Sequence, residues 1–218
     1  MLFNRLSKRN IADEVIFLED FIPQRLQDDV EKLFLSNFTP WYTDGDVWGK
    51  EYIDLDKTVL DNKNIIDSTG FHHMVYYDQK PLSEHFLVCN SILYFLEMKM
   101  NIKIKDILRI RARLTTQTQQ HNYSSYCGPH VDFLGENDYY SFVYYVHDTD
   151  GDTFVFDETV DKISNNPGSL SDPKILKRFT PKKGSAIFFT GDIFHAGNCP
   201  IKEKLRVVLN YDIKISKK

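Results

Sequence analysis

The sequence predicts a mainly β protein, a sandwich or jelly roll in a single domain, with helices covering one outer face. Segments with helical spacing occupy the N-terminal part, whereas short β-branched and aromatic segments separated by turns follow after about residue 105. Long helices do not alternate with these segments, which argues against a parallel, doubly wound sheet. A chain of 218 residues is long enough for one large domain of this kind.

Two helices are predicted in the first half. QRLQDDVEKLFLSNF (24–38) has apolar residues at helical spacing and follows VIFLEDFIP (15–23), which predicts a strand and a turn. LSEHFLVCNSILYFLEMKM (82–100) is the stronger helix, because its apolar residues recur at steps of three or four and Ser83 can cap it. Between them, residues 41–58 are rich in Asp and Gly and predict a loop with short strands.

The second half is predicted to consist of strands. DILRIRARLTTQTQ (106–119) alternates apolar and polar residues, as a half-buried strand does. Four further strands are predicted: YYSFVYYVHD (139–148), GDTFVFDE (151–158), GSAIFFTGD (184–192) and LRVVLNYDIKI (205–215). Residues 163–174 are polar with Pro and Gly and predict a mobile loop. The single domain 1–218 thus divides into a helical support region (1–104) and a strand-rich core (105–214).

Composition narrows the classes of function. The net charge of −4, with acids and bases well mixed, argues against a dedicated nucleic-acid binder, which normally shows a basic patch. The cysteines, Cys89, Cys127 and Cys199, are odd in number and far apart, which predicts a reducing compartment. The N-terminus does not look like a signal peptide, and no apolar run is long enough to span a bilayer. We therefore expect a soluble, cytoplasmic protein without a membrane partner.

GPHVDF (128–133) places His130 and Asp132 two residues apart. Alone, this pair is close to what chance supplies, and the plain alternative is a turn histidine beside an acid. On a strand, residues i and i+2 point to the same face, so both side chains can converge on one ion. His195, just after an apolar strand in FFTGDIFHAGNCP, can supply a third ligand. Two histidines and one carboxylate make the facial triad of non-haem Fe(II) oxygenases.

Arg206 follows His195 by eleven residues, on a strand that would run back through the core. A basic side chain pointing inward there is costly unless it meets an anion. Because a guanidinium matches a carboxylate, the natural anion is the distal carboxylate of 2-oxoglutarate. The alternative is a surface residue that pairs with a neighbouring acid.

Four stretches occur in a characteristic order: HVD (130–132), GDTFVF (151–156), PKKGSAIFFTGDIFHAGNCPI (181–201) and LRVVLNY (205–211). Together they resemble the 2-oxoglutarate/Fe(II) dioxygenase superfamily, and within it the prolyl 4-hydroxylase-like branch. The resemblance implies a double-stranded β-helix (jelly-roll) core, Fe(II), 2-oxoglutarate and O2, with ascorbate as an optional addition. It also implies hydroxylation of an unactivated C–H bond in a peptidyl (for example prolyl) or small-molecule substrate, with release of succinate and CO2.

The resemblance also implies roles for individual residues. The iron ligands would be His130, Asp132 and His195. Arg206 would bind the 2-oxoglutarate carboxylate. Tyr145 lies where related enzymes use Tyr or Thr to contact the co-substrate, and its neighbour Tyr144 would face the other way. Tyr123 corresponds to a family tyrosine ahead of the HxD pair, although its spacing departs from the usual pattern.

Two other interpretations stay open. The spacings C-x-x-H and H-x-x-x-C are those of zinc sites, so a non-catalytic module could hold zinc through Cys127, His130, His195 and Cys199. Jelly rolls also serve as binding modules and cupin-type isomerases, because a fold alone does not determine function. Under the oxygenase interpretation, residues 160–178 and 43–58 are candidates for a lid over the substrate.

Overall fold

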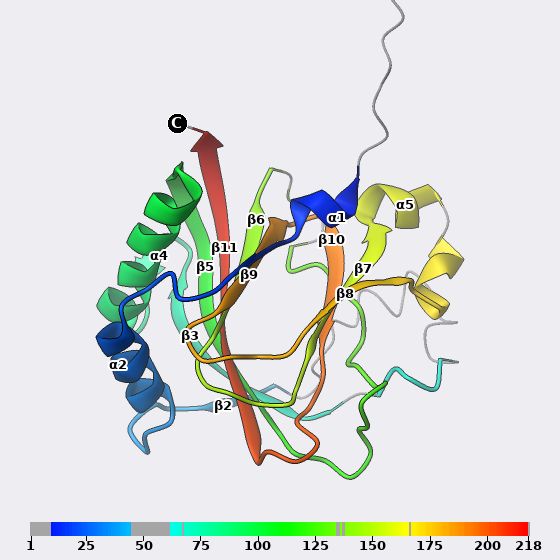
Figure 1. Ribbon diagram of the computed structural model, residues 1–218, viewed down its shortest axis with the longest axis horizontal. Helices are drawn as coiled ribbons and strands as arrows, with labels where there is room; N and C mark the ends of the chain where they lie inside the picture. Colours follow the sequence, from blue (N-terminus) through cyan, green and yellow to red (C-terminus); the bar gives the residue numbers. More distant parts are fainter. Residues whose placement is uncertain are drawn as a thin grey trace, which may run out of the picture.

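Two antiparallel sheets form the core of the computed structural model, which describes residues 10–44, 62–66, 68–133, 136, 138–165 and 167–217 (Figure 1). The larger sheet has the strand order β1-β9-β6-β11-β5-β3-β2, with β4 paired to β3. Its strands are β1 (Ile16–Leu18), β2 (Tyr42–Asp44), β3 (Gly70–Tyr77), β4 (Lys80–Pro81), β5 (Ile102–Thr116), β6 (Tyr140–Tyr145), β9 (Ala186–Thr190) and β11 (Leu205–Lys217). The smaller sheet, in the order β10-β7-β8, consists of β7 (Thr153–Thr159), β8 (Ile175–Phe179) and β10 (Ile193–Gly197).

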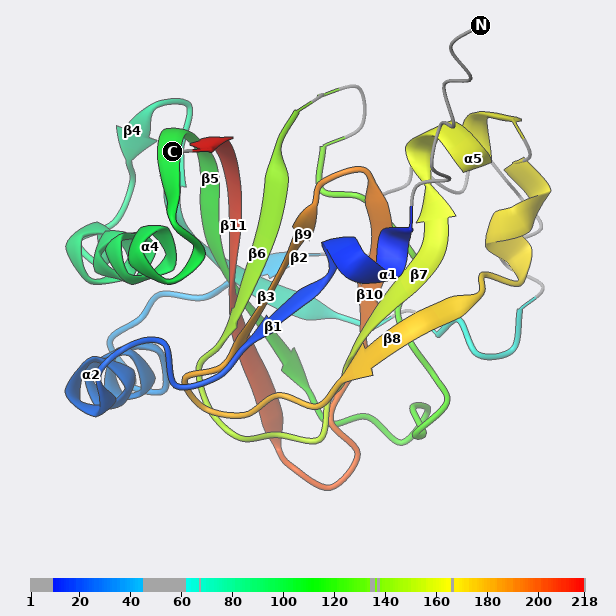
Figure 2. The ribbon, with the colours of Figure 1, turned by 45° about the horizontal axis from the view of Figure 1, so that its top comes forward.

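After β5 the chain winds back and forth between the two sheets (Figure 2). Strand β6 belongs to the larger sheet, β7 and β8 to the smaller, β9 to the larger, β10 to the smaller and β11 to the larger. Inward-facing side chains from both sheets, such as Tyr145 and Val155, meet in one apolar cluster. This arrangement is a double-stranded β-helix, so the predicted fold class is confirmed.

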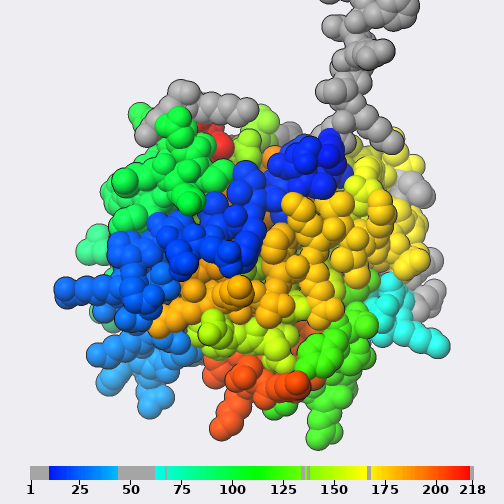
Figure 3. All heavy atoms as spheres, in the orientation of Figure 1, coloured from blue at the N-terminus to red at the C-terminus, as the bar shows by residue number. Residues whose placement is uncertain are grey.

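Helices α2 (Gln24–Phe34) and α4 (Phe86–Met100) cover the outer face of the larger sheet (Figure 1). Their buried apolar residues pack against the outward-facing residues of β5 and β11 in the largest hydrophobic cluster. Helix α1 (Ile11–Glu14) leads into β1, which pairs antiparallel with β9 at the edge of the larger sheet. Figure 3 shows this blue segment beside the yellow-orange part of the chain. Among the described helices, none is long and apolar enough to cross a membrane.

Helix α4 begins later than the sequence predicts, at Phe86, and Ser83 does not cap it. The Ser83 hydroxyl instead accepts a hydrogen bond from the His85 backbone amide, at 3.1 Å, and contacts the His73 ring at 2.7 Å. Helix α2 likewise ends at Phe34 rather than near residue 38.

The prediction of an irregular loop over residues 163–174 was wrong for most of its length. Helix α5 (Val160–Asn165) and a 3-10 turn, η2 (Pro167–Ser171), occupy it, because Ile163 and Leu170 are buried against the smaller sheet. Apart from its first two residues, the other lid candidate, 43–58, lies outside the described residues. The lid role of 160–178 stays a prediction.

Candidate metal centre and anion pocket

His130, Asp132 and His195 come together between the two sheets. One ligand atom from each residue lies within 4.8 Å of the others. His195 is in the middle of β10 rather than after a strand, and His130 belongs to no strand. The two histidines form an isolated antiparallel bridge, in which each backbone amide donates to the other's carbonyl at 2.9 Å. This single bridge brings the HxD pair beside the distant histidine.

Backbone carbonyls set the orientation of both imidazole rings. Nδ1 of His130 lies 2.9 Å from the Gly128 carbonyl oxygen, and Nδ1 of His195 lies 3.3 Å from that of Ile193. Because a carbonyl only accepts, each Nδ1 must carry a hydrogen, which leaves Nε2 as the nitrogen of each ring that can bind a metal. Nε2 of His195 is buried without a hydrogen-bond partner among the described residues and lies 3.4 Å from Oδ2 of Asp132. Metal-bound histidines are commonly held in this way.

The charge states of the triad also suit a cation. Burial, together with the neighbouring His195, lowers the pKa of His130 to about 3, so the ring is neutral at physiological pH. Burial works against ionisation of Asp132, but Arg109 and the two histidines hold the pKa of Asp132 well below its usual range. The neutral His130 imidazole and the Asp132 carboxylate can bind a divalent metal without losing a proton. The donor set fits Fe(II).

Arg109 connects Asp132 to a second buried acid. Its guanidinium contacts Oδ1 of Asp132 and lies 2.9 Å from Oδ2 of Asp212. The Ser141 hydroxyl lies 3.4 Å from both carboxylates. Burial and the Asp132 charge raise the pKa of Asp212 to about 7, although Arg109 opposes the shift. Arg109 therefore holds one oxygen of Asp132 and leaves Oδ2 facing His195.

Three arginines on β5 were not identified from the sequence as site residues. Arg109, Arg111 and Arg113 alternate with Ile110 and Ala112, which pack under the helices. The polar face of this strand therefore points into the core rather than to solvent, and Arg109 and Arg113 are each only 8% exposed. Three arginines at a spacing of two on one strand share a face, and this was the signal available in the sequence.

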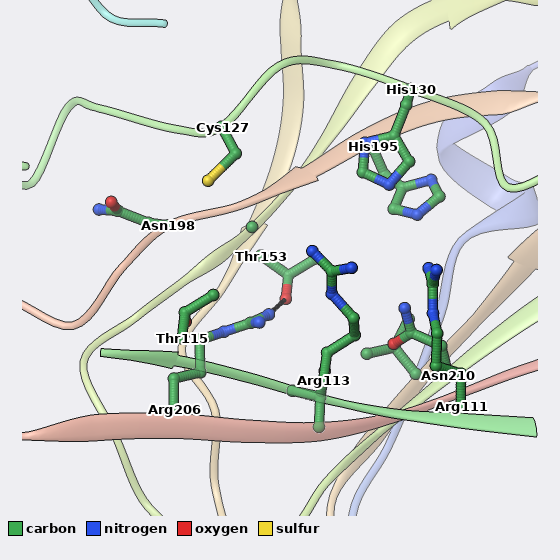
Figure 4. Close-up of a pocket in the computed structure, with 13 residues that line it drawn as sticks. Arg111, Arg113, Thr115, Cys127, His130, Thr153, His195, Asn198, Arg206 and Asn210 are labelled. Atoms are coloured by element: carbon green, nitrogen blue, oxygen red, sulfur yellow. Dashed lines mark hydrogen bonds between the residues drawn. The ribbon is translucent and has the colours of Figure 1, made fainter. Parts of the chain in front are cut away.

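A pocket lies between the triad and Arg206 (Figure 4). Arg111 and Arg113 project from β5 toward the side of the pocket that holds His130 and His195, and Arg206 enters the pocket from β11. None of the described residues that line it is acidic. Burial, reinforced by the neighbouring arginines, lowers the pKa of Arg111 to about 9. Cations gathered in a buried pocket without acids favour an anionic ligand.

Arg206 is oriented by neutral partners. Its Nε donates to the Gly151 carbonyl at 2.6 Å, and one terminal nitrogen donates to the Thr153 hydroxyl at 2.8 Å. A Cβ on Gly197 would lie 3.2 Å from the other terminal nitrogen, so the absence of a side chain there leaves room for the guanidinium. Arg206 is 6% exposed. None of its hydrogen bonds to the described residues neutralises the charge, so a carboxylate of a ligand would do so.

The three tyrosines considered from the sequence lie in different places. Tyr145 is buried between the sheets, close to Thr153 and Arg206, and burial raises the pKa of its hydroxyl. Tyr144 faces the opposite side, in the cluster under the helices, as expected. Tyr123 does not line the pocket: its side chain is 45% exposed, and its ring lies 5.9 Å from the Lys202 ammonium. The structure thus shows no contact of Tyr123 with the site, because the loop before His130 carries this side chain outward.

The two cysteines near the triad do not join it. Cys127 and Cys199 group with His121, separately from the cluster of His130, Asp132 and His195. The zinc set of two cysteines with His130 and His195 is therefore wrong as a grouping. The short spacing in the sequence was misleading, because Cys199 lies two residues beyond the end of β10 and in a different cluster from His195.

Acidification should destabilise the metal-free protein through His130. Because the folded-state pKa of about 3 lies below the ordinary 6.5, the unfolded state binds the proton first as the pH falls. This ring alone should lower the free energy of unfolding by about 1.4 kcal/mol between about pH 7.5 and about pH 5.5. Urea unfolding with chelator at both pH values should show a smaller loss for His130→Gln. An equal loss in both proteins would contradict the assignment.

Comparison with known proteins shows similarity at the level of the fold. No protein-family model matches the chain, and no curated protein is a detectable relative. An oxidoreductase of the 2OG-Fe(II) oxygenase family from Burkholderia pseudomallei is similar, with a TM-score of 0.60 and 13% identity over 96% of this chain and 93% of that chain. The non-haem alpha-ketoglutarate-dependent epimerase SnoN from nogalamycin biosynthesis has a TM-score of 0.50 and 11% identity over 93% and 80%.

A prolyl-4-hydroxylase from Pseudomonas putida also matches, with 12% identity over 94% of this chain and 96% of that chain. Its TM-score of 0.49 is too low to distinguish one branch of such proteins from another. At these identities the similarity is one of fold. The chain therefore has the double-stranded β-helix found in the 2OG-Fe(II) oxygenases.

Proposed function

We propose that this chain, which has the fold of the 2OG-Fe(II) oxygenases, is a 2-oxoglutarate- and Fe(II)-dependent dioxygenase. The observation that carries the proposal is that one acid-free pocket opens onto both His130 and His195 at one side and Arg206 at the other. A metal-binding triad and a buried cation at opposite ends suit a dicarboxylate that contacts both. The reaction we infer is hydroxylation of an unactivated C–H bond with release of succinate and CO2.

Each residue has a distinct task in this proposal. Iron, held by His130, Asp132 and His195, would activate O2 and supply the oxidising chemistry. Arg206 would pair with one carboxylate of 2-oxoglutarate, with its fork already aligned by Gly151 and Thr153. Preformed geometry of this kind lowers the entropy cost of binding.

The remaining arginines balance charge and hold a ligand in place. Arg111 lies 3.6 Å from Oδ1 of Asp132, so it borders both the carboxylate and the pocket. A 2-oxoglutarate dianion would offset the charges of Arg111 and Arg113, which otherwise repel each other. Arg109 keeps Asp132 oriented.

The substrate belongs to the proposal as a class. We favour a peptidyl substrate, with a prolyl residue as the first choice, or a small molecule. Proteins with this fold act differently, since the similar structures include an epimerase as well as a prolyl-4-hydroxylase. A non-catalytic jelly roll is the competing function, and such a module has no use for an acid-free pocket beside a metal triad.

An assay of coupled turnover tests the proposal. Anaerobic addition of Fe(II) and 2-oxoglutarate should produce an absorbance band of the metal chelate. Under air, with ascorbate present, the protein should form succinate faster when a peptide or metabolite substrate is supplied. Mass spectrometry should then find a product heavier by one oxygen atom. A protein that shows neither the chelate band nor succinate would be a binding module rather than an oxygenase.

A further inference from the structure

A second group of buried metal-ligating side chains lies apart from the triad. One nitrogen of His121 and the sulfurs of Cys127 and Cys199 all lie within 4.8 Å of one another. The three residues are at most 5% exposed. The proposed oxygenase reaction uses none of them. They come from two segments far apart in the sequence, the loop after β5 and the turn after β10.

The contact with Asn198 determines which ring nitrogen of His121 remains for a metal. The Asn198 amide nitrogen donates to the Asn122 carbonyl at 3.0 Å, which places its oxygen toward Nδ1 of His121, at 2.5 Å. Since an amide oxygen only accepts, Nδ1 carries a hydrogen, which leaves Nε2 as the nitrogen that can bind a metal. Nε2 is buried without a hydrogen-bond partner among the described residues. A histidine that donates through one nitrogen and presents the other is the usual arrangement at a metal.

The two thiols are arranged around one hydroxyl. Sγ of Cys199 lies 3.1 Å from the Ser68 hydroxyl, and Sγ of Cys127 lies 3.6 Å from it. Metals bind cysteine as the thiolate, and the two sulfurs lie close enough to each other and to His121 to share one ion.

We propose that His121, Cys127 and Cys199 bind a Zn²⁺ ion, with the Ser68 hydroxyl or a water in the fourth position. Two sulfurs and one imidazole suit zinc, whereas the two imidazoles and carboxylate of the triad suit iron. Zinc–sulfur bonds of about 2.3 Å in a tetrahedron place the two sulfurs about 3.8 Å apart. The three ligand atoms lie within 4.8 Å of one another, which is compatible with this separation.

The position of the cluster gives the zinc a structural role. Cys127 precedes His130 by three residues, and Cys199 follows His195 by four. The Cys127 amide also donates to the Gly197 carbonyl at 2.8 Å, so the two segments are already in contact. Zinc would fasten the irregular loop that carries His130 to the end of β10. Cys127 and Asn198 also line the pocket, which places this fastening beside Arg206 (Figure 4).

Cobalt substitution separates this site from the iron triad. One equivalent of Co(II) added anaerobically to the chelator-stripped full chain should produce an intense near-ultraviolet thiolate-to-metal charge-transfer band once the sulfur site fills. The triad contains no sulfur and cannot produce this band. The Asp132→Ala variant should retain the band, and so should Cys89→Ala, because Cys89 lies on the buried face of α4, away from the cluster. Cys199→Ser and His121→Ala should lose or shift it.

Metal content provides the second readout. Protein purified under reducing conditions without added metal should contain about one zinc per chain, and Cys199→Ser should contain little. A wild-type chain that binds Co(II) without a charge-transfer band would overturn the zinc site, whatever the folding of the variants. So would a band that persists equally in Cys127→Ser and Cys199→Ser, or a zinc-free wild-type chain lighter by two hydrogens through a Cys127–Cys199 disulfide. These outcomes are independent of 2-oxoglutarate turnover, so the oxygenase proposal is tested separately.

Discussion

Asp132→Ala is expected to abolish the Fe(II)–2-oxoglutarate absorbance band and to lower succinate formation by at least about a hundredfold. Removal of even an outer partner of a metal ligand commonly costs ten- to about a hundredfold, and Asp132 is the carboxylate of the triad itself. The two histidines alone leave the metal without an anionic ligand. Anaerobic titration with Fe(II) and 2-oxoglutarate measures the band, and a succinate assay measures turnover.

The fold of the Asp132→Ala variant should survive, because Arg109 keeps Asp212 as a partner at 2.9 Å. Far-ultraviolet circular dichroism and a urea unfolding curve check this. Asp157→Ala is the matched control, since Asp157 pairs with Lys162 and Lys174 at the surface and borders no part of the pocket. If Asp132→Ala folds and still forms the chelate band at wild-type Fe(II) concentrations, Asp132 is not an iron ligand.

Arg206→Ala is expected to raise the KM for 2-oxoglutarate by about a hundredfold or more, while Fe(II) affinity changes little. Removing one partner of a buried, hydrogen-bonded charge pair costs several kcal/mol. The carboxylate of 2-oxoglutarate would lose both the positive charge and the paired N–H donors of the guanidinium. Arg206→Lys should recover part of the affinity, because lysine keeps the charge but lacks the planar pair of donors. KM for 2-oxoglutarate and an Fe(II) titration of each variant separate the two effects.

Arg178→Ala is the matched control for Arg206. Arg178 lies on β8, pairs with Asp152 and stacks over Phe154, but it does not line the pocket. Its loss should leave the KM for 2-oxoglutarate near the wild-type value. If Arg206→Ala weakens Fe(II) and 2-oxoglutarate binding equally, Arg206 supports the structure of the core rather than binding the co-substrate.

Local patterns were enough to predict the strand-rich core and the covering helices. The period-two alternation in 106–119 marks a strand whatever lies around it, and the apolar face of 82–100 requires a surface to cover. The same alternation did not reveal which face is inside. Arg109, Arg111 and Arg113 look like a solvent face in the sequence, but the second sheet encloses them, so they line the site instead.

The candidate ligands His130, Asp132 and His195, with Arg206, could be named from spacing and order along the chain, because residue chemistry is a local property, although the HxD pair lies on no strand. Which side chains share a site was decided only in the folded chain. The bridge between His130 and His195 brings the triad together, while Cys199, two residues beyond the end of β10, lies beside His121. The path of the loop before His130 places Tyr123 outside. Sequence specifies the donors, but their grouping depends on long-range strand pairing, and no local pattern contains that information.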